Sequence, residues 1–415
     1  MRTLLLLLCT VLPALHALAQ KTCGTVQYQA QVRQQFPQSL YRNGIQLPAS
    51  IAEQADLFSG SPGQTIVIPV VVHLLFNSSV NEITDEKIQS QISILNRDFN
   101  LTDLSSLNIP AVFMQVAGRA NIRFELAKVD PNGRATTGIT RKKSSRLLWG
   151  NDDKIKDPSY GGVAPWDAGS YLNIWLGNLV PGLLGYASAP GSPANKDGVV
   201  IKTSVFGEAG GSYSKGRTTV HEIGHWLNLQ HLWGDGTCGS DQVDDTPPQK
   251  TFNQGCPGFP KLNSSCGNGD ANGEMFMNFM DFTDDACMVM FTKGQVLRMR
   301  SLFYPGEARA SILQSRGLGT PWNSGEPFIV DDPSGNDAKV NIKTNPQPVV
   351  SSVVLTASNG SLHQVAYSLF SMEGRALRNG ILTGETPMLN FADLKPGVYF
   401  IKLNGYRKAV RIVKL

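Results

Sequence analysis

The spacing of apolar positions predicts that the central part of the chain mixes strands with helices. Apolar runs or strict alternation, which are typical of buried and half-buried strands, occur at 65–72, 122–126, 172–176 and 199–201. A helix capped by Thr84 is expected after the first strand, because four apolar residues follow at helical spacing. These residues are Ile88, Ile92, Leu95 and Phe99. A capping box formed by Thr292 and Gln295 predicts a last helix that continues to about Phe303.

The two ends of the chain differ from this centre. Residues 1–19 combine a basic start, an apolar stretch and the small residues of a cleavage site, the pattern of a signal peptide rather than a membrane anchor. Residues 20–62 are polar and rich in glutamine, and they predict a pro-segment. A linker rich in Gly, Pro, Ser and Asn is expected at 315–336. Short alternating strands separated by glycine turns predict a small β-sandwich at 337–415.

Composition narrows the classes of function. The chain has 415 residues with a formal net charge of only +4, and its Lys and Arg residues form no cluster or stripe. Nucleic acid is therefore not an expected partner. No other apolar run approaches membrane length, so no transmembrane anchor is expected.

Cysteine usage fits an exported protein, because disulfides form outside the reducing cytosol. Four cysteines lie in the second half of the chain: Cys238, Cys256, Cys266 and Cys287. Four cysteines allow three pairings, and the sequence alone does not choose among them.

Three of the six histidines fall in one run of eleven residues, His221-Glu222-Ile223-Gly224-His225-Trp226-Leu227-Asn228-Leu229-Gln230-His231. On a helix His221 and His225 lie one turn apart on the same face, so both imidazoles can bind one metal ion. Glu222 follows the first of them, where its carboxylate can act on a water molecule activated by the metal. The run predicts a catalytic zinc site with its own general base.

His231 can reach the same ion only if the helix ends before it. Continued helix would carry it about 15 Å along the axis from His221, whereas zinc–nitrogen bonds are about 2 Å long. We expect the turn at Asn228, because asparagine adopts the left-handed conformation more readily than most residues.

This motif resembles the long zinc motif of the metzincin clan, with Asn228 where the clan normally has glycine. Metzincins place a methionine in a turn beneath the zinc, and Met280 in Asn278-Phe279-Met280-Asp281-Phe282 matches it. Three further segments complete a resemblance to the pappalysin family over roughly residues 65 to 310. They are His225-Trp226-Leu227, Cys287 and Phe291-Thr292-Lys293-Gly294-Gln295. The family usually has tyrosine where this chain has Phe282, so any help that the hydroxyl gives to the transition state is missing here.

The resemblance implies a fold of the α+β class. It consists of a metzincin-type catalytic domain at 63–314, with a twisted mixed sheet plus backing and active-site helices, followed by the small C-terminal β-sandwich. The implied activity is that of a secreted zinc metalloendopeptidase, a hydrolase of proteins or peptides that is made as a zymogen. His221, His225 and His231 would bind the zinc, and Glu222 would be the catalytic base. The alternative is a zinc-containing cell-surface binding protein with little proteolysis, which the presence of Glu222 disfavours.

The resemblance also implies roles for the cysteines of the mature and precursor protein. Cys23 in the pro-segment would be a zymogen switch, with its thiolate taking the place of water at the zinc. The alternative is a stray thiol or an intermolecular disulfide. The family pairing alternates, which here means Cys238–Cys266 and Cys256–Cys287.

Three further sets of residues follow from the family pattern. An oxygen-rich loop is similar to a calcium site of the family, although a solvated acidic turn is the alternative. Its residues are Asp241, Asp244, Asp245 and Thr246. Tyr186 lies in the segment 184–188, which is the expected edge strand for pairing with extended substrate. Asp284 and Asp285 would line a primed-side pocket and favour Arg or Lys after the cut bond. The alternative is that both carboxylates are solvated or bind calcium.

The last part of the chain resembles the C-terminal sorting domain of type IX secretion. The matching segments are Asn345-Pro346, Glu373-Gly374-Arg375, 394–401 and 410–415. The resemblance implies that the export machinery is a partner, and that the protein is secreted or attached to the cell surface. A generic carbohydrate- or protein-binding module is the alternative.

Overall fold

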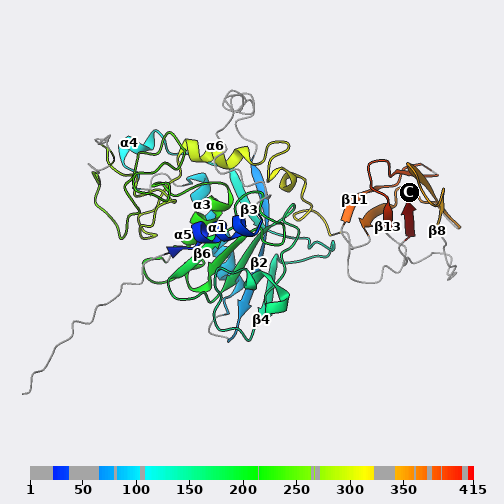
Figure 1. Ribbon diagram of the computed structural model, residues 1–415, viewed down its shortest axis with the longest axis horizontal. Coiled ribbons are helices and arrows are strands. Elements are labelled where there is room, and N and C mark those ends of the chain that lie inside the picture. Colours follow the sequence, from blue (N-terminus) through cyan, green and yellow to red (C-terminus); the bar gives the residue numbers. More distant parts are fainter. Residues whose placement is uncertain are drawn as a thin grey trace, which may run out of the picture. The chain divides into compact units, whose positions relative to one another are not determined.

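The computed structural model divides the chain into two compact units, residues 1–321 and 322–415 (Figure 1). The described residues are 22–36, 65–78, 82–102, 108–213, 215–262, 266, 272–321, 342–358, 361–371, 376–384, 386–403 and 410–415. The expected signal peptide at 1–19, most of the expected pro-segment and linker, and Glu373-Gly374-Arg375 lie outside them. No described helix is long and apolar enough to cross a membrane.

A mixed seven-stranded sheet organises the first unit, in the order β1-β6-β7-β5-β2-β3 with β4 also paired to β2. Its strands are β1 (Thr22–Cys23), β2 (Ile66–Phe76), β3 (Ile122–Leu126), β4 (Ile139–Lys143), β5 (Leu172–Gly177), β6 (Leu183–Ala187) and β7 (Val199–Lys202). Neighbouring strands are parallel except β6 and β7, which are antiparallel. The four strands expected from the apolar pattern are β2, β3, β5 and β7, and the edge strand that the family resemblance implied at 184–188 is β6.

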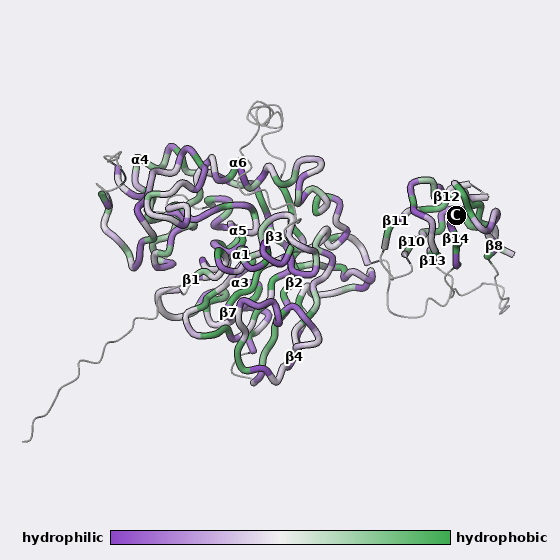
Figure 2. The backbone as a smooth tube through the Cα atoms, viewed as in Figure 1, coloured by the Kyte–Doolittle hydropathy of each residue, from purple (hydrophilic) through white to green (hydrophobic). Residues whose placement is uncertain are grey.

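The longest strand, β2, lies at the centre of the hydrophobic core. Its sequence is almost wholly apolar because strands of parallel sheets are buried on both faces, and Figure 2 shows the hydrophobic colouring of this region. β3 pairs with its first half and β4 with its second half. The expectation for 65–72 was therefore correct in type but short in length. β4 was missed because its sequence, ITRKK, has neither an apolar run nor a buried face.

The two helices expected from the sequence are present. In α3 (Asp85–Asn100), the Thr84 side chain accepts a hydrogen bond from the Lys87 backbone N–H, and the four stripe residues are buried. In α6 (Lys293–Ser301), the capping box of Thr292 and Gln295 is present. Among the described residues of the first unit outside the pro-segment, the other helices are α4 (Ala111–Met114), α5 (Arg217–Trp226), η3 (Lys154–Lys156), η4 (Pro158–Tyr160), η5 (Thr203–Val205) and η6 (Ala310–Gln314).

The described part of the expected pro-segment, residues 22–36, lies against the sheet. β1 pairs with β6, and α1 (Thr25–Gln35) follows it at once. Figure 1 shows α1 in blue among the green elements β6 and α5, far away in the sequence. The helix was not expected, because its apolar residues are few, but Thr25, Tyr28 and Val32 are buried on one face. Contact with the sheet, not helical periodicity, therefore determines the position of this segment.

The segment between α5 and α6 has no helix or strand in its described residues. Two disulfides, Cys238–Cys266 and Cys256–Cys287, cross-link it. This is the alternating pairing that the family resemblance implied. Because the segment has little regular hydrogen bonding of its own, these cross-links restrict the conformations available to it.

The second unit consists of two antiparallel sheets. One has the order β11-β10-β13-β14 and the other β12-β9-β8. The strands are β8 (Ile342–Asn345), β9 (Ser352–Ala357), β10 (Ala366–Ser371), β11 (Ala376–Ile381), β12 (Met388–Asn390), β13 (Gly397–Leu403) and β14 (Val410–Lys414). Buried residues from both sheets, including Val353, Leu369 and Ile401, form one core. The expected small β-sandwich is therefore present.

Candidate metal centre

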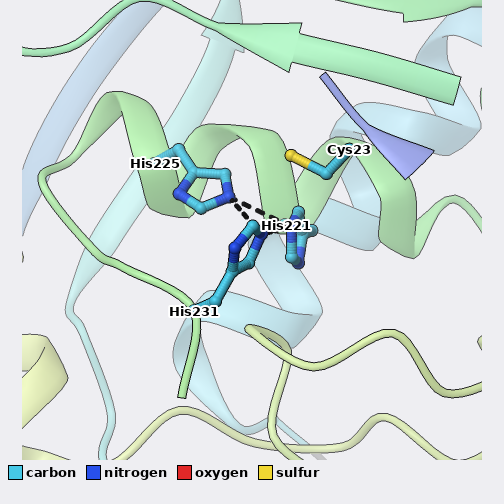
Figure 3. Close-up of side chains that lie close together, drawn as sticks. All are labelled: Cys23, His221, His225 and His231. Carbon is cyan, nitrogen blue, oxygen red and sulfur yellow. Dashed lines mark hydrogen bonds between the residues drawn. The ribbon is translucent and has the colours of Figure 1, made fainter. Parts of the chain in front are cut away.

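Three imidazoles converge on one point in the first unit (Figure 3). His221 and His225 lie one turn apart on α5, all of whose residues are buried. The Nε2 atoms of His221, His225 and His231 are 3.1, 3.1 and 3.3 Å from one another. Ligands that bind an ion tetrahedrally at about 2.0–2.1 Å are about 3.3 Å apart. The three nitrogens therefore have the spacing that zinc requires.

A left-handed turn at Asn228 brings the third histidine back. The φ angle of Asn228 is 72°, in the region that asparagine tolerates better than most residues. The Leu229 backbone N–H donates to the Gly224 carbonyl at 2.9 Å, and the Asn228 N–H donates to the His225 carbonyl. These bonds close the end of α5 in the manner of a Schellman motif. The turn expected at this residue is confirmed.

The outer nitrogen of each ring faces an oxygen atom. The Nδ1 atoms of His221 and His225 lie 2.7 and 2.9 Å from the carbonyl oxygens of Phe279 and Leu229. Nδ1 of His231 lies 2.5 Å from Oδ1 of Asp235. Since a carbonyl or carboxylate oxygen only accepts, each neutral ring carries its proton on Nδ1. The lone pairs of all three Nε2 atoms then point at the common centre, where a cation would offset their repulsion.

His225 is neutral at any ordinary pH. Burial, together with the neighbouring His231, lowers the pKa of His225 to about 3. A neutral imidazole is the form that binds a metal. The ring therefore needs no deprotonation before it can serve as a ligand.

The methionine turn lies directly beneath the histidines. Met280 is fully buried, and a Cβ atom at Gly224 would stand only 2.6 Å from its Sδ atom. Glycine at 224 is thus required for this close approach. Phe282, two residues later, packs its ring against His221 and His231, with centroids 5.6 and 4.9 Å apart. The position that carries tyrosine in the family is therefore next to the site, but offers no hydroxyl here.

Two carboxylates that the sequence analysis did not single out support this centre. Asp235 holds the His231 ring, and it follows that histidine by four residues in a glycine-flanked turn. Asp281 follows Met280 and accepts hydrogen bonds from the backbone and side chain of Asn253. Burial raises the pKa of Asp281 to about 6 despite these donors. The sequence signal that points to Asp235 is a carboxylate placed four residues after a ligand histidine.

Asp285 anchors the start of α5. Its Oδ2 atom accepts from the backbone N–H groups of Lys215 and Arg217, at 2.9 and 3.0 Å. Arg217 in turn pairs with Asp98 of α3 at 3.1 Å. Its carboxylate thus positions the zinc helix, and its expected role in a substrate pocket stays a prediction. Asp284 is half-buried and remains the other candidate of the pair.

Cys23 reaches the three histidines from the pro-segment. Its Sγ atom and one nitrogen of each ring all lie within 4.8 Å of one another. The Cys23 thiol also donates to Oε2 of Glu222 at 3.5 Å, and the Thr25 hydroxyl donates to the same oxygen at 2.7 Å. Burial and the charge of Glu222 raise the pKa of the Cys23 thiol well above its ordinary value. A cation between the histidines would oppose this effect and favour the thiolate.

The segment 184–188 lies mainly in β6, whose outer edge carries β1. The Gly24 backbone N–H donates to the Gly185 carbonyl at 2.9 Å. A Cβ atom at Gly185 would meet Glu222, so this position faces the zinc helix. The next residue, Tyr186, points to the other face, where its ring packs against Tyr28 with centroids 4.7 Å apart. The expected substrate contact from the Tyr186 side chain is therefore not directed at the histidines.

The candidate calcium residues do not form one cluster of carboxylates. Oδ1 of Asp241 accepts from the Thr246 hydroxyl at 2.8 Å, which orders the turn. Asp245 accepts from the Thr292 hydroxyl and the Gly294 N–H, and so caps α6. Asp244 is exposed. One buried atom of the group, Oδ2 of Asp241, has no hydrogen-bond partner among the described residues.

Comparisons with known proteins agree with this geometry. The model of peptidase family M43, described as pregnancy-associated plasma protein-A, matches residues 162–303. An extracellular metalloprotease of Verticillium alfalfae is 32% identical over 251 residues, covering 58% of this chain and 76% of that protein.

Two solved structures from Tannerella forsythia are also similar. Mature mirolysin in complex with a cleaved peptide is 48% identical, with a TM-score of 0.59, and the match covers 61% of this chain and 97% of that one. A promirolysin mutant is 44% identical, with a TM-score of 0.62, and the match covers 71% and 97%.

Backbone conformation at Asn228 predicts the effect of two substitutions. Asn228→Gly should leave zinc affinity unchanged and be neutral or stabilising, because glycine adopts positive φ without steric cost. Asn228→Val should weaken zinc binding, since a β-branched residue resists this conformation. Competition with a chromogenic chelator measures the affinities. Equal affinity in all three proteins would contradict the role of this turn.

Proposed function

This chain belongs to the pappalysin family of metzincin metalloproteases and is a metalloendopeptidase, and on that basis we propose how its residues divide the work of peptide-bond hydrolysis. Its substrates are proteins or peptides. Zinc is the metal that the family implies, and the three nitrogens fit it in number, spacing and proton position. When bound, zinc polarises the scissile carbonyl and makes a nearby water molecule more acidic.

Glu222 is the proposed general base. Its buried carboxylate follows His221, the first ligand on α5. Oε2 accepts a hydrogen bond from the Thr25 hydroxyl, which belongs to the segment next to the histidines. In the mature protein Oε2 would take the proton of the attacking water and pass it to the leaving amine. Gly185 permits this placement, because a Cβ there would lie 2.9 Å from Cγ of Glu222. The contact of Oε2 with the segment that covers the metal centre is the observation that carries this assignment.

Substitution of the base separates catalysis from metal binding. Glu222→Ala should lower kcat at least about a hundredfold, the lower end of the range for general base catalysis, while the protein still binds one zinc. Hydrolysis of casein, together with metal analysis of the same preparation, measures both. Glu208→Ala is the matched control, since Glu208 is exposed and precedes α5. Substantial activity in pure, zinc-loaded Glu222→Ala protein would refute the mechanism.

We propose that the pro-segment keeps the zymogen inactive at two points. Cys23 offers a sulfur ligand to the metal centre, and Thr25 ties up the base. The Thr25 hydroxyl is held in place because it also accepts from the Ala187 backbone N–H at 2.9 Å. β1 meanwhile occupies the edge of β6 that an extended substrate would need. The binding-protein alternative has no comparable support, because a non-catalytic site has no need to mask a carboxylate.

Precursor variants test this latency. Cys23→Ala should hydrolyse a quenched peptide before processing, or mature faster, because water can then reach the metal. Thr25→Val should add to this effect, whereas Thr25→Ser keeps the hydroxyl and should not. Activity and processing are followed together by fluorescence and gel electrophoresis. Latency equal to the wild type in Cys23→Ala would contradict the switch.

We also propose a structural calcium ion at the Asp241 loop. Oδ2 of Asp241 is buried and has no hydrogen-bond partner among the described residues, and burial raises the pKa of this carboxyl to about 6. A hard cation that takes several oxygens from one loop would satisfy it. Asp244, Asp245 and Thr246 are the nearby sources of further oxygens.

Calcium should raise the melting temperature of the wild type, and should do so much less in Asp241→Ala. Thermal unfolding in calcium and in a calcium chelator measures the difference. An identical melting temperature in both solutions would rule out the ion.

A preference for Arg or Lys after the cut bond is proposed to depend on Asp284. This residue follows Phe282, whose ring contacts the ligand histidines, and its partner Asp285 is already engaged at α5. A charge-assisted hydrogen bond contributes about 1.5–3 kcal/mol, which corresponds to a preference of about tenfold to a hundredfold.

Asp284→Ala should abolish this preference, whereas Asp285→Ala should destabilise the protein. Mapping of cleavage sites in a peptide library measures the preference, and thermal unfolding measures the stability. No enrichment of Arg or Lys in the wild type would end the proposal.

Export is the last element of the proposed function. The extracellular relatives support secretion, and the C-terminal β-sandwich would engage the export machinery. Two of its matching segments, at 397–401 and 410–414, pair as β13 and β14. Activity in the medium and on the cell surface, compared with a chain lacking 337–415, tests this role.

A further inference from the structure

Tyr28 of the pro-segment fills a site on the Tyr186 side of β6, the face opposite the one that Gly185 presents to the zinc helix. Its side chain is 1% exposed, and its ring packs on Tyr186 of β6. The Tyr28 hydroxyl donates to Oδ2 of Asp153 at 3.1 Å and accepts from Nζ of Lys156 at 3.1 Å. The surrounding residues therefore contact both the ring and the hydroxyl of Tyr28. An apolar anchor for α1 would need only the ring contacts.

The ammonium group of Lys156 is the centre of this pocket. Lys156 is 3% exposed, and its Nζ atom lies 4.7 Å from the ring centroid of Tyr28, with Trp175 and Tyr186 at 5.3 and 5.1 Å. Besides the Tyr28 hydroxyl, Nζ is 2.7 Å from the Lys196 carbonyl and 2.8 Å from Oδ1 of Asp153. An ammonium group has three N–H donors. Three oxygen atoms and three aromatic rings surround Nζ. Tyr28 of the pro-segment supplies one of the oxygen atoms and one of the rings.

Maturation removes that partner. Lys196 also pairs with Asp153, at 2.7 Å, so the rest of the pocket is held by the catalytic domain itself. Loss of Tyr28 would leave a largely buried ammonium with one donor unused, which is costly. A side chain that brings back a ring and an oxygen atom would restore both interactions.

An extended substrate can reach this pocket. In a strand, successive side chains point to opposite faces of the sheet. Cys23 points to the histidines, and a Cβ atom on the next residue, Gly24, would lie 3.6 Å from Cβ of Tyr186. That Cβ would also meet the flexible end of Leu183 at 2.6 Å. A peptide strand that replaces β1 therefore directs one side chain, next to the position facing the metal, toward the Tyr186 side.

We propose that the pocket filled by Tyr28 in the precursor becomes a specificity pocket of the mature protease, which binds a tyrosine side chain of the substrate close to the cut bond. This proposal rests on the proposed function, since it needs a mature enzyme whose substrate adds to β6. Phenylalanine would regain the ring contacts but not the hydrogen bonds to Lys156 and Asp153.

Matched peptides test the pocket in the mature, zinc-loaded enzyme. A cleavage profile first identifies the position, within about two residues of the cut bond, at which tyrosine is enriched. Peptides that differ only there, by Tyr, Phe or Leu, then give kcat/KM. The kcat/KM of the tyrosine peptide should exceed that of the phenylalanine peptide about tenfold, because only tyrosine can form a hydrogen bond to the charged groups. In Lys156→Met this ratio should fall several-fold, because only the hydrogen bond to Asp153 remains.

Lys154→Met is the matched control, because Lys154 lies on the same short helix, η3, but reaches solvent and pairs with Asp152. It should keep the wild-type ratio. The proposal is overturned if no position favours tyrosine over phenylalanine in the wild type, a result that does not depend on whether Lys156→Met folds. It is also overturned if Lys156→Met keeps the ratio. Zinc-dependent cleavage without a tyrosine preference refutes only this inference, whereas no cleavage of any peptide refutes the proposed function.

Discussion

The convergence of three imidazole nitrogens is the constraint on which the rest of the first unit depends. Three lone pairs about 3 Å apart repel one another until a cation lies between them, so the surrounding structure must hold the rings in place. It does so by fixing each Nδ1 with an oxygen, from Phe279, Leu229 and Asp235. The methionine turn thus supplies a hydrogen bond through Phe279 as well as a floor through Met280. The turn at Asn228 supplies both the Leu229 carbonyl and the return of His231.

Buried charges hold the two ends of the zinc helix. At its start, Arg217 pairs with Asp98, and the Arg217 N–H binds Asp285. At its end, Arg309 pairs with Asp197 and stacks over Trp226, with its guanidinium carbon 3.8 Å from the ring centroid. Such pairs contribute little net stability, because both charges lose their hydration, but removing one partner is costly. Their value here is orientation, since α5 must present two histidines and Glu222 to a single point.

The pro-segment uses the features that make the site catalytic. β1 pairs with the edge of β6, the Cys23 sulfur lies next to the histidines, and the Thr25 hydroxyl donates to Glu222, the proposed base. α1 then places Tyr28 against Lys156. Each contact copies an interaction that a substrate or water would make in the proposed mechanism. The pro-segment is therefore held tightly although it is short. Its contacts also indicate which groups a substrate would contact.

Local patterns determined much of this protein. Histidine spacing, the turn at Asn228, the N-cap at Thr84, the capping box at Thr292 and the apolar strands depend on short-range geometry, so the sequence alone indicated them. Tertiary structure decided the rest. The sequence could not show that Asp285 anchors α5, that Tyr186 faces away from the histidines, or that Asp235 orients His231, because a side chain's role depends on which distant groups surround it. For the same reason α1 and the pocket around Lys156 were not foreseen. The buried face of α1 has only three residues, one of them a threonine, and only the folded sheet brings residues 28 and 156 together.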